Sequence, residues 1–218
     1  MVAAQRLRRR MRHTDHKLRD EYLAHSPVAK LHIGGGPRCL EGWLNADIAL
    51  LPGVVQMDAT QPFPFVDGVF NYIFTEHMIE HVPFQDGSRM LRECHRVLRT
   101  DGIIRITTPN LVSIVGLFTT NPSPAQQRYM NWFCKAAIAP DCPATPANAI
   151  NAMFRLWGHQ FIYDEETLAA TLRRAGFKEI SRHPLTESEH QELRNLENVQ
   201  RYPVGLLEFE SLALEARK

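Results

Sequence analysis

Glycines and acids at the ends of apolar stretches are the first residues in this chain whose types and spacing could do chemistry. The apolar run 31–33 is followed at once by Gly34, Gly35 and Gly36, and the next apolar stretch leads to Asp47. Glycine adopts positive φ and lets the backbone approach a ligand closely. Ligands of open α/β sheets bind outside the carboxyl ends of the strands. The pattern therefore predicts a backbone cradle beside a carboxylate that can accept both hydroxyls of a ribose, although a glycine triplet also suits an ordinary surface turn.

Two further apolar stretches also end in ionisable residues. The stretch 54–57 leads into Asp58, and the stretch 70–74 leads into Thr75-Glu76-His77-Met78-Ile79-Glu80-His81, the densest cluster of ionisable groups in the chain. Strand ends of a parallel sheet meet at one edge, so this cluster is expected beside the glycine turn. A histidine with a pKa near neutrality suits proton transfer. Asp58 alone could equally be a turn residue, and His81 could be a structural histidine at a helix start.

The same cluster matches the inverted zinc-peptidase signature H-x-x-E-H, through His77, Glu80 and His81. A zinc site of that kind needs both histidines on one face of a sustained helix, with a third ligand elsewhere. A strand-like run precedes His77, and Pro83 follows His81 closely. A long helix is therefore not expected, no metal ligand is predicted, and a zinc peptidase is kept only as the less favoured alternative.

Composition narrows the class of protein. The chain has 218 residues and a formal net charge of +1, which fits one domain with an insertion and argues against a general nucleic-acid binder. Its four cysteines form no C-x-x-C pair, which favours reduced thiols over disulfides or a zinc knuckle. The sequence contains neither an apolar run of about 18 residues nor an apolar signal core. We therefore expect a soluble, cytoplasmic protein.

The first 29 residues are predicted to form a unit distinct from the domain over residues 30–218. Arginine and lysine recur through residues 6–19, with Leu7, Met11, Leu18 and Tyr22 at helical spacing. This spacing predicts a basic amphipathic helix. Its basic face could meet an anionic membrane surface or RNA, or belong to a transit sequence. The alternative is a helix that packs its apolar stripe over the sheet and leaves the basic face in solvent.

Apolar periodicity further along the chain predicts alternating helices and strands. We expect a helix over 86–98 that is stopped by Gly102, a strand over 103–108, a helix beginning at 111, a helix over 164–176 capped by Asp164, and strands over 177–181 and 206–216. Between residues 120 and 158, prolines separate two short helical patterns rich in aromatic residues, including Trp132, Phe133 and Trp157. The polar run 187–200 is predicted to be a surface excursion or a short helix.

Two nucleotide-binding patterns compete for residues 30–47. The dinucleotide fingerprint needs a third Gly or Ala and an acid about 20 residues further on, whereas here the third position is Cys39 and Asp47 comes too early. The segment resembles instead the first two motifs of class I S-adenosylmethionine (SAM) dependent methyltransferases, in the small-molecule branch called type 11. Later blocks resemble the same branch in the same order: QPFPFVDGVFNYIF from residue 61, EHVP from residue 80, LRECHRVLRTDGIIRITTPN from residue 91, and the stretch from His159 to Phe177.

Three features depart from the pattern of that branch. His32 stands where many members carry an acid, and Asn71 replaces the terminal Asp of the family's fourth-strand motif. The connection 37–42 is too short for the usual helix, because a parallel crossover normally takes about a dozen residues or more. Contacts that relatives make from that helix are therefore not carried over to this chain.

The resemblance implies a Rossmann-like α/β fold with SAM as its cofactor. The sheet would be twisted, seven-stranded and mostly parallel with its last strand reversed, and a helical lid would be inserted after strand five over about 120–158. The implied cofactor-binding residues are Gly34, Gly35, Gly36, Asp47, Ile48, Asp58, Ala59, Thr75 and Glu76. The same match points His81 towards the transferred methyl group and His159 towards the substrate, with His77 as a further catalytic candidate. Capping or packing is the alternative role for each histidine, and burial of the insertion is the alternative role for its aromatic residues.

The function that follows is methyl transfer to an oxygen or nitrogen of a small molecule, such as a sugar, a glycolipid precursor or a secondary metabolite, with a histidine as general base. The alternative from another class is a non-catalytic protein of the same fold that serves as a partner in a complex. A small-molecule acceptor is the expected partner, without nucleic acid or integral membrane contact. A peripheral membrane contact of the basic N-terminus and a homodimer both stay open.

Overall fold

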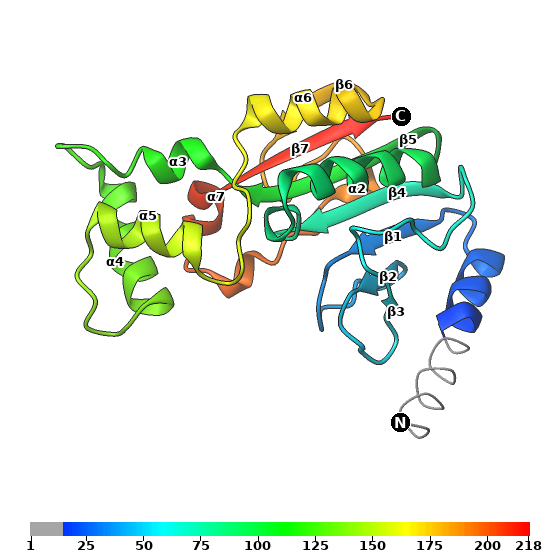
Figure 1. The fold of residues 1–218 in the computed structure, drawn as a ribbon, viewed down its shortest axis with the longest axis horizontal. Coiled ribbons are helices and arrows are strands. Elements are labelled where there is room, and N and C mark those ends of the chain that lie inside the picture. The colour runs from blue at the N-terminus through cyan, green and yellow to red at the C-terminus, as the bar shows by residue number, and fades with distance from the viewer. Residues whose placement is uncertain (1–14) are drawn as a thin grey trace.

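A seven-stranded sheet forms the centre of the computed structural model, which describes residues 15–218 (Figure 1). Its strands are β1 (Lys30–Ile33), β2 (Leu44–Asp47), β3 (Val55–Gln56), β4 (Phe70–Glu76), β5 (Leu98–Pro109), β6 (Lys178–His183) and β7 (Ser211–Arg217). They lie in the order β3-β2-β1-β4-β5-β7-β6. Only β7 runs antiparallel to its neighbours. The predicted mostly parallel sheet with a reversed last strand is confirmed.

The register of the central strands brings the predicted site residues to one edge. Ile33 at the end of β1 lies opposite Ala46 in β2 and Thr75 in β4. The backbone N–H of Gly34 donates to the Ala46 carbonyl at 2.8 Å, which continues the pairing into the glycine turn. The turn therefore sits between the end of β2 and the end of β4, where the strand order reverses and where open α/β sheets bind ligands.

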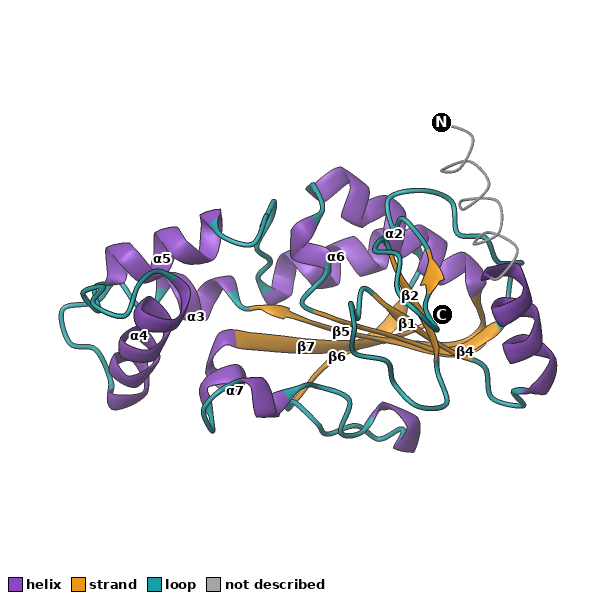
Figure 2. Cartoon of the chain, turned by 90° about the horizontal axis from the view of Figure 1, so that it is seen from below, coloured by secondary structure: helices purple, strands orange, loops and turns teal. Residues whose placement is uncertain are grey.

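Two helices cover one face of the sheet, α2 (Phe84–Val97) and α6 (Glu165–Ala175) (Figures 1 and 2). The stripe that α2 buries recurs at helical spacing and consists of Met90, Leu91, Cys94 and Val97. α6 begins as predicted, because the Asp164 side chain accepts a hydrogen bond from the backbone N–H of Thr167. It ends before Gly176, the C-cap residue, whose φ of 107° lies in the left-handed region that glycine favours.

Residues 184–202 cross the opposite face of the sheet (Figure 2) and include the short 3₁₀ turns η2 (Gln191–Leu193) and η3 (Val199–Arg201). Beneath them Arg105 of β5 is fully buried. Its guanidinium donates to the carboxylates of Glu197 at 2.7 Å and Glu215 at 2.6 Å, and to the backbone carbonyls of Pro184 and Glu187. The polar run predicted as a surface excursion is thus fixed to the sheet by buried charges.

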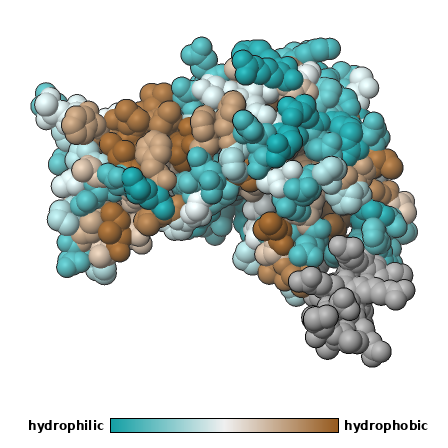
Figure 3. Space-filling model, in the orientation of Figure 1, coloured by the Kyte–Doolittle hydropathy of each residue, from teal (hydrophilic) through white to brown (hydrophobic). Residues whose placement is uncertain are grey.

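The insertion after β5 folds into helices at the carboxyl end of the sheet (Figure 1). Its helices are α3 (Leu111–Val115), α4 (Pro124–Ala137) and α5 (Pro146–Arg155). Together with Leu206 of α7 (Leu206–Glu210) they build an apolar cluster of their own. Figure 3 shows apolar side chains gathered on the outer surface of this region. The exposed large apolar residues of the insertion include Val112, Val115 and Phe118.

Residues 15–25 form the described part of the predicted N-terminal helix. Leu18, Tyr22 and Leu23 pack against the main core, and the Tyr22 hydroxyl accepts a hydrogen bond from the backbone N–H of Lys30 at 2.8 Å. For residues 15–25, the helix therefore packs its apolar side chains against the protein core, as the second alternative in the sequence analysis expected. Residues 1–14, which hold most of the predicted basic stretch, lie outside the described residues. None of the helices within residues 15–218 combines the length and the apolar character needed to cross a membrane.

Three boundaries differ from the sequence-based expectation. α2 ends at Val97 and β5 begins at Leu98, so Gly102 lies within the strand and does not stop the helix. The last strand begins at Ser211, because Leu206–Glu210 forms α7. β3 has only two residues. Short apolar runs carry too little periodicity to separate a helical turn from a strand, which explains the error at residues 206–210.

Candidate active site

The glycine turn lies at the tip of β1, and its three glycines are required for different reasons. A Cβ at Gly34 would collide with the side chain of Met78, and one at Gly35 would collide with the ring of His32. A Cβ at Gly36, where φ is 55°, would meet nothing within 4 Å. The first two glycines accommodate the protein's own side chains. Gly36 borders open space, so its backbone stays accessible to a ligand.

His32 supports this turn from inside the sheet. Its ring is 1% exposed, stacks on Phe74 with centroids 5.5 Å apart, and its Nδ1 lies 2.9 Å from Oδ1 of Asn45. Burial disfavours the charged form and lowers the pKa of His32 to about 4, against the opposing hydrogen bond to Asn45. The residue that departs from the family pattern is therefore a neutral packing element beneath Gly35.

The two predicted acids lie at the tips of β2 and β3. Asp47 accepts hydrogen bonds from the backbone N–H groups of Gly36 and Ala49, each at 2.8 Å and each through a different oxygen. A carboxylate oxygen has two lone pairs, so Asp47 keeps acceptor capacity on both. Asp58 accepts from the N–H and the hydroxyl of Thr60 through Oδ1 alone. Asp58 is therefore a turn residue, which was one of the two roles that the sequence allowed. Its second oxygen makes no hydrogen bond to residues 15–218.

The remaining predicted cofactor residues lie in mixed environments. Ile48 is 66% exposed, and Ala59 packs partly against the main core. Thr75 is buried, and its hydroxyl has no hydrogen-bond partner among the described residues. Glu76 is engaged by the protein itself: its two oxygens accept from Arg38 at 3.0 Å and from the backbone N–H of Asn198 at 2.9 Å.

Arg38 links the glycine-turn segment to the segment that crosses the far face of the sheet. Its second terminal nitrogen donates to the backbone carbonyl of Leu196 at 2.6 Å. Together with the contact between Glu76 and Asn198, this bond ties residues 196–198 to the tips of β1 and β4. Neither tie was predicted from the sequence.

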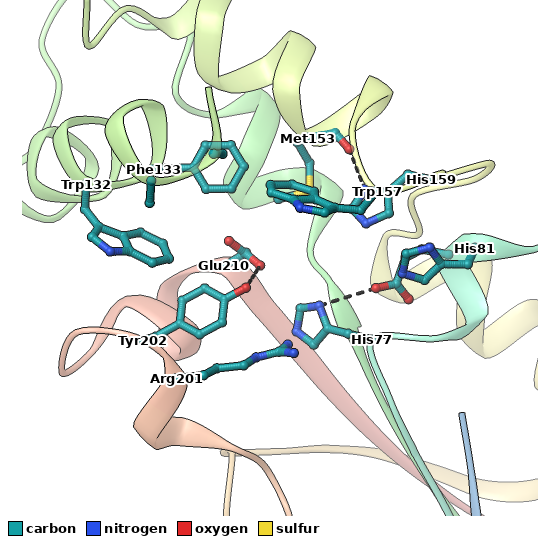
Figure 4. A pocket seen from close by; sticks show the side chains of 13 residues that line it. His77, His81, Trp132, Phe133, Met153, Trp157, His159, Arg201, Tyr202 and Glu210 are labelled. Atoms are coloured by element: carbon teal, nitrogen blue, oxygen red, sulfur yellow. Dashed lines mark hydrogen bonds and ion pairs between the residues drawn. The ribbon is translucent and has the colours of Figure 1, made fainter. Parts of the chain in front are cut away.

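A buried ion pair between His77 and Glu80 lies directly after the end of β4. Nδ1 of His77 lies 3.3 Å from a carboxylate oxygen of the fully buried Glu80, and Nε2 lies 2.9 Å from the hydroxyl of Ser211 (Figure 4). Burial alone would lower the pKa of His77, but the hydrogen bond and attraction of Glu80 outweigh it and raise that pKa. Burial likewise opposes ionisation of Glu80, yet His77 lowers its pKa. Both shifts have the signs expected of an ion pair.

His81 and His159 meet at the mouth of the same region, with ring centroids 4.8 Å apart. The Glu80 backbone carbonyl accepts from the N–H groups of Gln160 and Phe161, which holds the loop that carries His159 beside η1 (Ile79–His81). Partial burial lowers the pKa of His81, with Glu80 opposing the shift. Nδ1 of His159 lies 2.5 Å from the Met153 carbonyl oxygen, so this nitrogen carries a proton and donates to the carbonyl, which fixes the orientation of the ring.

A cavity of about 420 Å³ opens between these strand tips and the insertion. Its floor is formed by His77, Glu80 and Glu210, and its wall by aromatic side chains (Figure 4). The rings follow one another from Tyr202 to Trp132 (4.8 Å), Phe133 (6.2 Å), Trp157 (5.7 Å) and His159 (5.6 Å). Aromatic walls with a few convergent polar groups are typical of small-molecule sites.

The residues of the inverted zinc motif are not arranged as a zinc peptidase requires. η1 is a single 3₁₀ turn of three residues, and His77 is turned to Glu80 and Ser211. A different set, Glu80, His81 and His159, brings three potential ligand atoms within 4.8 Å of one another. Ligand atoms that bind one zinc ion at about 2.0–2.2 Å must lie closer to one another than 4.8 Å. Proximity of the three atoms within 4.8 Å therefore does not by itself form a zinc site.

Comparison with known proteins identifies the domain. Residues 42–106, which span β2 to β5, match the family model described as a methyltransferase domain. A crystal structure of a SAM dependent methyltransferase from Archaeoglobus fulgidus is similar, with a TM-score of 0.52 and 16% identity over 95% of this chain and 94% of that chain. One from Mesorhizobium loti gives a TM-score of 0.52 and 15% identity over 88% and 91%. At such identities the likeness shows the fold. A search of the curated proteins found no match.

The chain carries a class I SAM-dependent methyltransferase domain of the type 11 branch. The expected fold, enzyme class and cofactor are thereby confirmed. The matched residues include Asp47, Asp58 and the β4 tip, but neither the glycine turn nor the insertion.

Sequence reasoning missed several cavity residues of this methyltransferase. Arg201 and Tyr202 lie at the end of η3, just beyond the polar run 187–200, and Glu210 was assigned to a strand. Glu210 is 2% exposed and accepts hydrogen bonds from the hydroxyls of Tyr129 at 2.6 Å and Tyr202 at 2.9 Å. The sequence signal was a pair of acids, Glu208 and Glu210, that alternate with apolar residues, a pattern that a strand explains equally well.

Proposed function

We propose that this methyltransferase transfers its methyl group to an oxygen or nitrogen of a small molecule bound in the cavity, with His81 as the general base. One observation carries the proposal: His81, which burial holds towards the neutral form, lines a cavity of about 420 Å³ between the strand tips and the insertion. That volume lies within the range of about 300–1,000 Å³ for small-molecule sites. The helices α4 and α5 would act as the lid.

The cofactor would lie on the glycine-turn side of the same edge. Open space at Gly36, spare lone pairs on Asp47 and the unengaged oxygen of Asp58 fit a nucleoside held by its backbone, ribose and adenine contacts. Ile48, Ala59 and Thr75 border this region, whereas Glu76 would act mainly by holding Arg38. Met78 contacts the turn at Gly34 and directly follows His77 of the cavity floor, so the two compartments adjoin.

The three histidines would have different tasks. SAM supplies a methyl group already made electrophilic by its sulfonium, so the chain has to align the acceptor and remove its proton. A neutral His81 can take that proton, a step typically worth about 10²–10⁴ in rate. His159, oriented by the Met153 carbonyl, would position His81 or replace it. His77 is engaged on both ring nitrogens and would instead fix Glu80.

The test measures S-adenosylhomocysteine release from SAM with a panel of small hydroxyl and amine compounds, followed by comparison of His81→Asn with the wild type. We expect the rate for an accepted compound to fall by about 10²–10⁴, while SAM affinity by calorimetry stays unchanged. The matched control is His25→Asn on the N-terminal helix, where the exposed ring makes a hydrogen bond to the Glu21 carbonyl, and it should keep full activity. Full activity of His81→Asn would refute the assignment of the base.

The alternative to a general base is that Glu80, His81 and His159 together bind a metal ion. Metal analysis of the desalted active protein, with and without a chelator, separates the two. The general-base reading predicts activity that is independent of metal content. Activity lost with the chelator and restored by one divalent metal would make His81 a ligand and not the base.

A further inference from the structure

The cavity is lined by the ion pair of His77 and Glu80 and by two further charged groups, Glu210 and Arg201, whose partners differ. Glu80 is paired with His77 and also accepts from the Thr108 hydroxyl at 3.1 Å. Both oxygens of Glu210 accept from tyrosine hydroxyls. Arg201 is the exception, because within residues 15–218 its guanidinium has neither a carboxylate within 4.0 Å nor a hydrogen-bond acceptor, although it lines the cavity. Its five N–H donors are therefore available to a ligand.

The backbone around Arg201 is held in place. Residues 196–198 are bonded to Arg38 and Glu76, and the N–H of Arg201 donates to the Asn198 carbonyl at 3.3 Å. The guanidinium carbon lies 5.1 Å from the centroid of the Tyr202 ring. A planar cation stacked on a ring is preorganised, so little side-chain entropy would be lost on binding a carboxylate or phosphate.

Figure 4 shows the Arg201 side chain reaching from the Tyr202 side of the cavity towards His77, while the proposed base His81 lies on the other side of His77, next to His159. The wall begins at Tyr202, which Arg201 contacts, and ends at His159, which contacts His81. A flat acceptor lying along the wall would thus present one end to a guanidinium and the other to an imidazole. Arginine binds planar anions through two parallel hydrogen bonds, which fixes orientation as well as charge.

We propose that the acceptor is a ring compound with one anionic group, a carboxylate or phosphate, which Arg201 binds while the aromatic wall holds the ring. The inference rests on the proposed function in placing the acceptor in this cavity. A cationic acceptor is disfavoured, because Glu80 is already ion-paired with His77 and accepts a hydrogen bond from Thr108, and both oxygens of Glu210 accept from tyrosine hydroxyls. An ammonium group would have to compete with those internal donors and would approach an unpaired guanidinium.

The experiment titrates the full-length protein, saturated with S-adenosylhomocysteine, with 4-hydroxybenzoate, its neutral analogue 4-hydroxybenzamide, and the cation tyramine, each by calorimetry. We expect the benzoate to bind at least about tenfold more tightly than the amide, as a charge-assisted hydrogen bond implies. Arg201→Gln should remove this preference. Arg174→Gln, which deletes the same charge from the exposed surface of α6, should retain it.

The outcomes are separable from those of the proposed function. Equal affinity for the benzoate and the amide, tighter binding of tyramine, persistence of the preference in Arg201→Gln, or no saturable binding of any probe would each overturn the inference. S-adenosylhomocysteine affinity is recorded in the same titrations. If it is normal while the preference is absent, the methyltransferase assignment stands and only the role of Arg201 fails.

Discussion

The two halves of this site are built in different ways. On the glycine-turn side, short strands and backbone N–H groups form the site, and the buried His32 is neutral with a pKa near 4. On the cavity side, His77 after the end of β4 and side chains from η1, η3, α4, α5 and α7 converge, and the buried His77 is paired with Glu80. The two buried histidines thus differ in charge: His32 on β1 is neutral, whereas His77, directly after the end of the neighbouring strand β4, is the cation of an ion pair.

The comparison teaches that burial alone does not decide the charge of a histidine in this protein. The ring of His32 contacts an amide and an aromatic ring, and burial, which lowers its pKa together with Arg38, outweighs the Asn45 hydrogen bond and Asp47, which raise it, so desolvation prevails. His77 has a carboxylate within 3.3 Å, and the pair's attraction prevails. The first half can form from a local stretch of chain, whereas the second requires distant segments to be in place.

The largest expected effect concerns the buried network that fixes residues 184–202 beneath the cavity. Arg105→Met would leave Glu197 and Glu215 buried without their cation. Such a loss costs about 3–5 kcal/mol of unfolding free energy, measurable by urea denaturation. Arg99→Met at an exposed position is the control and should change stability little. A loss for Arg105→Met no larger than that of the control would show that the cavity side does not depend on this network.

The second largest expected effect is on the pH dependence of stability, to which His32 and His77 should contribute with opposite signs. The folded pKa of His32 lies below its unfolded value of about 6.5, so stability is lost as pH falls, by up to about 3 kcal/mol near pH 4. The folded pKa of His77 is raised, so its contribution is complete below about 6.5 and lost as pH rises through the folded value.

Urea denaturation of the wild type, His32→Gln and His77→Asn between pH 4.5 and 8.5 checks both signs. Asparagine suits position 77 because φ there is 47°, a conformation that it tolerates well. The advantage of the wild type over His32→Gln should shrink towards acid, and its advantage over His77→Asn should shrink towards alkali. Parallel curves for the three proteins would contradict the assigned charge states.

The smallest effect sharpens the description of the glycine turn. Gly34→Ala and Gly36→Ala both place alanine at positive φ, but only the first collides with Met78. We expect Gly34→Ala to be less stable than Gly36→Ala by about 1–3 kcal/mol, an overpacking cost. Adding Met78→Ala should remove the difference. Gly36→Ala should instead weaken SAM binding in calorimetry, because its methyl group enters the open space beside the turn. Equal stability of the two alanine variants would mean that Met78 does not restrict the turn.

The sequence by itself determined the succession of strands along the chain and which residues stand at their carboxyl ends. Gly34–Gly36, Asp47, Asp58 and the β4 cluster each follow an apolar stretch directly, and the carboxyl ends of parallel strands share one edge. The Asp164 cap and the Gly176 stop were equally visible, because each depends on its immediate neighbours. These features needed no knowledge of distant contacts.

Only the tertiary structure decided how the cavity is closed and which groups in it are charged. Tyr129 and Glu210 are 81 residues apart, Arg105 and Glu197 are 92 apart, and Arg38 and Leu196 are 158 apart. Periodicity reports which face of an element is apolar, but not which distant side chain will lie against it. Burial and partner distance also set the charge of His32 and His77, and both quantities exist only once the strands have packed.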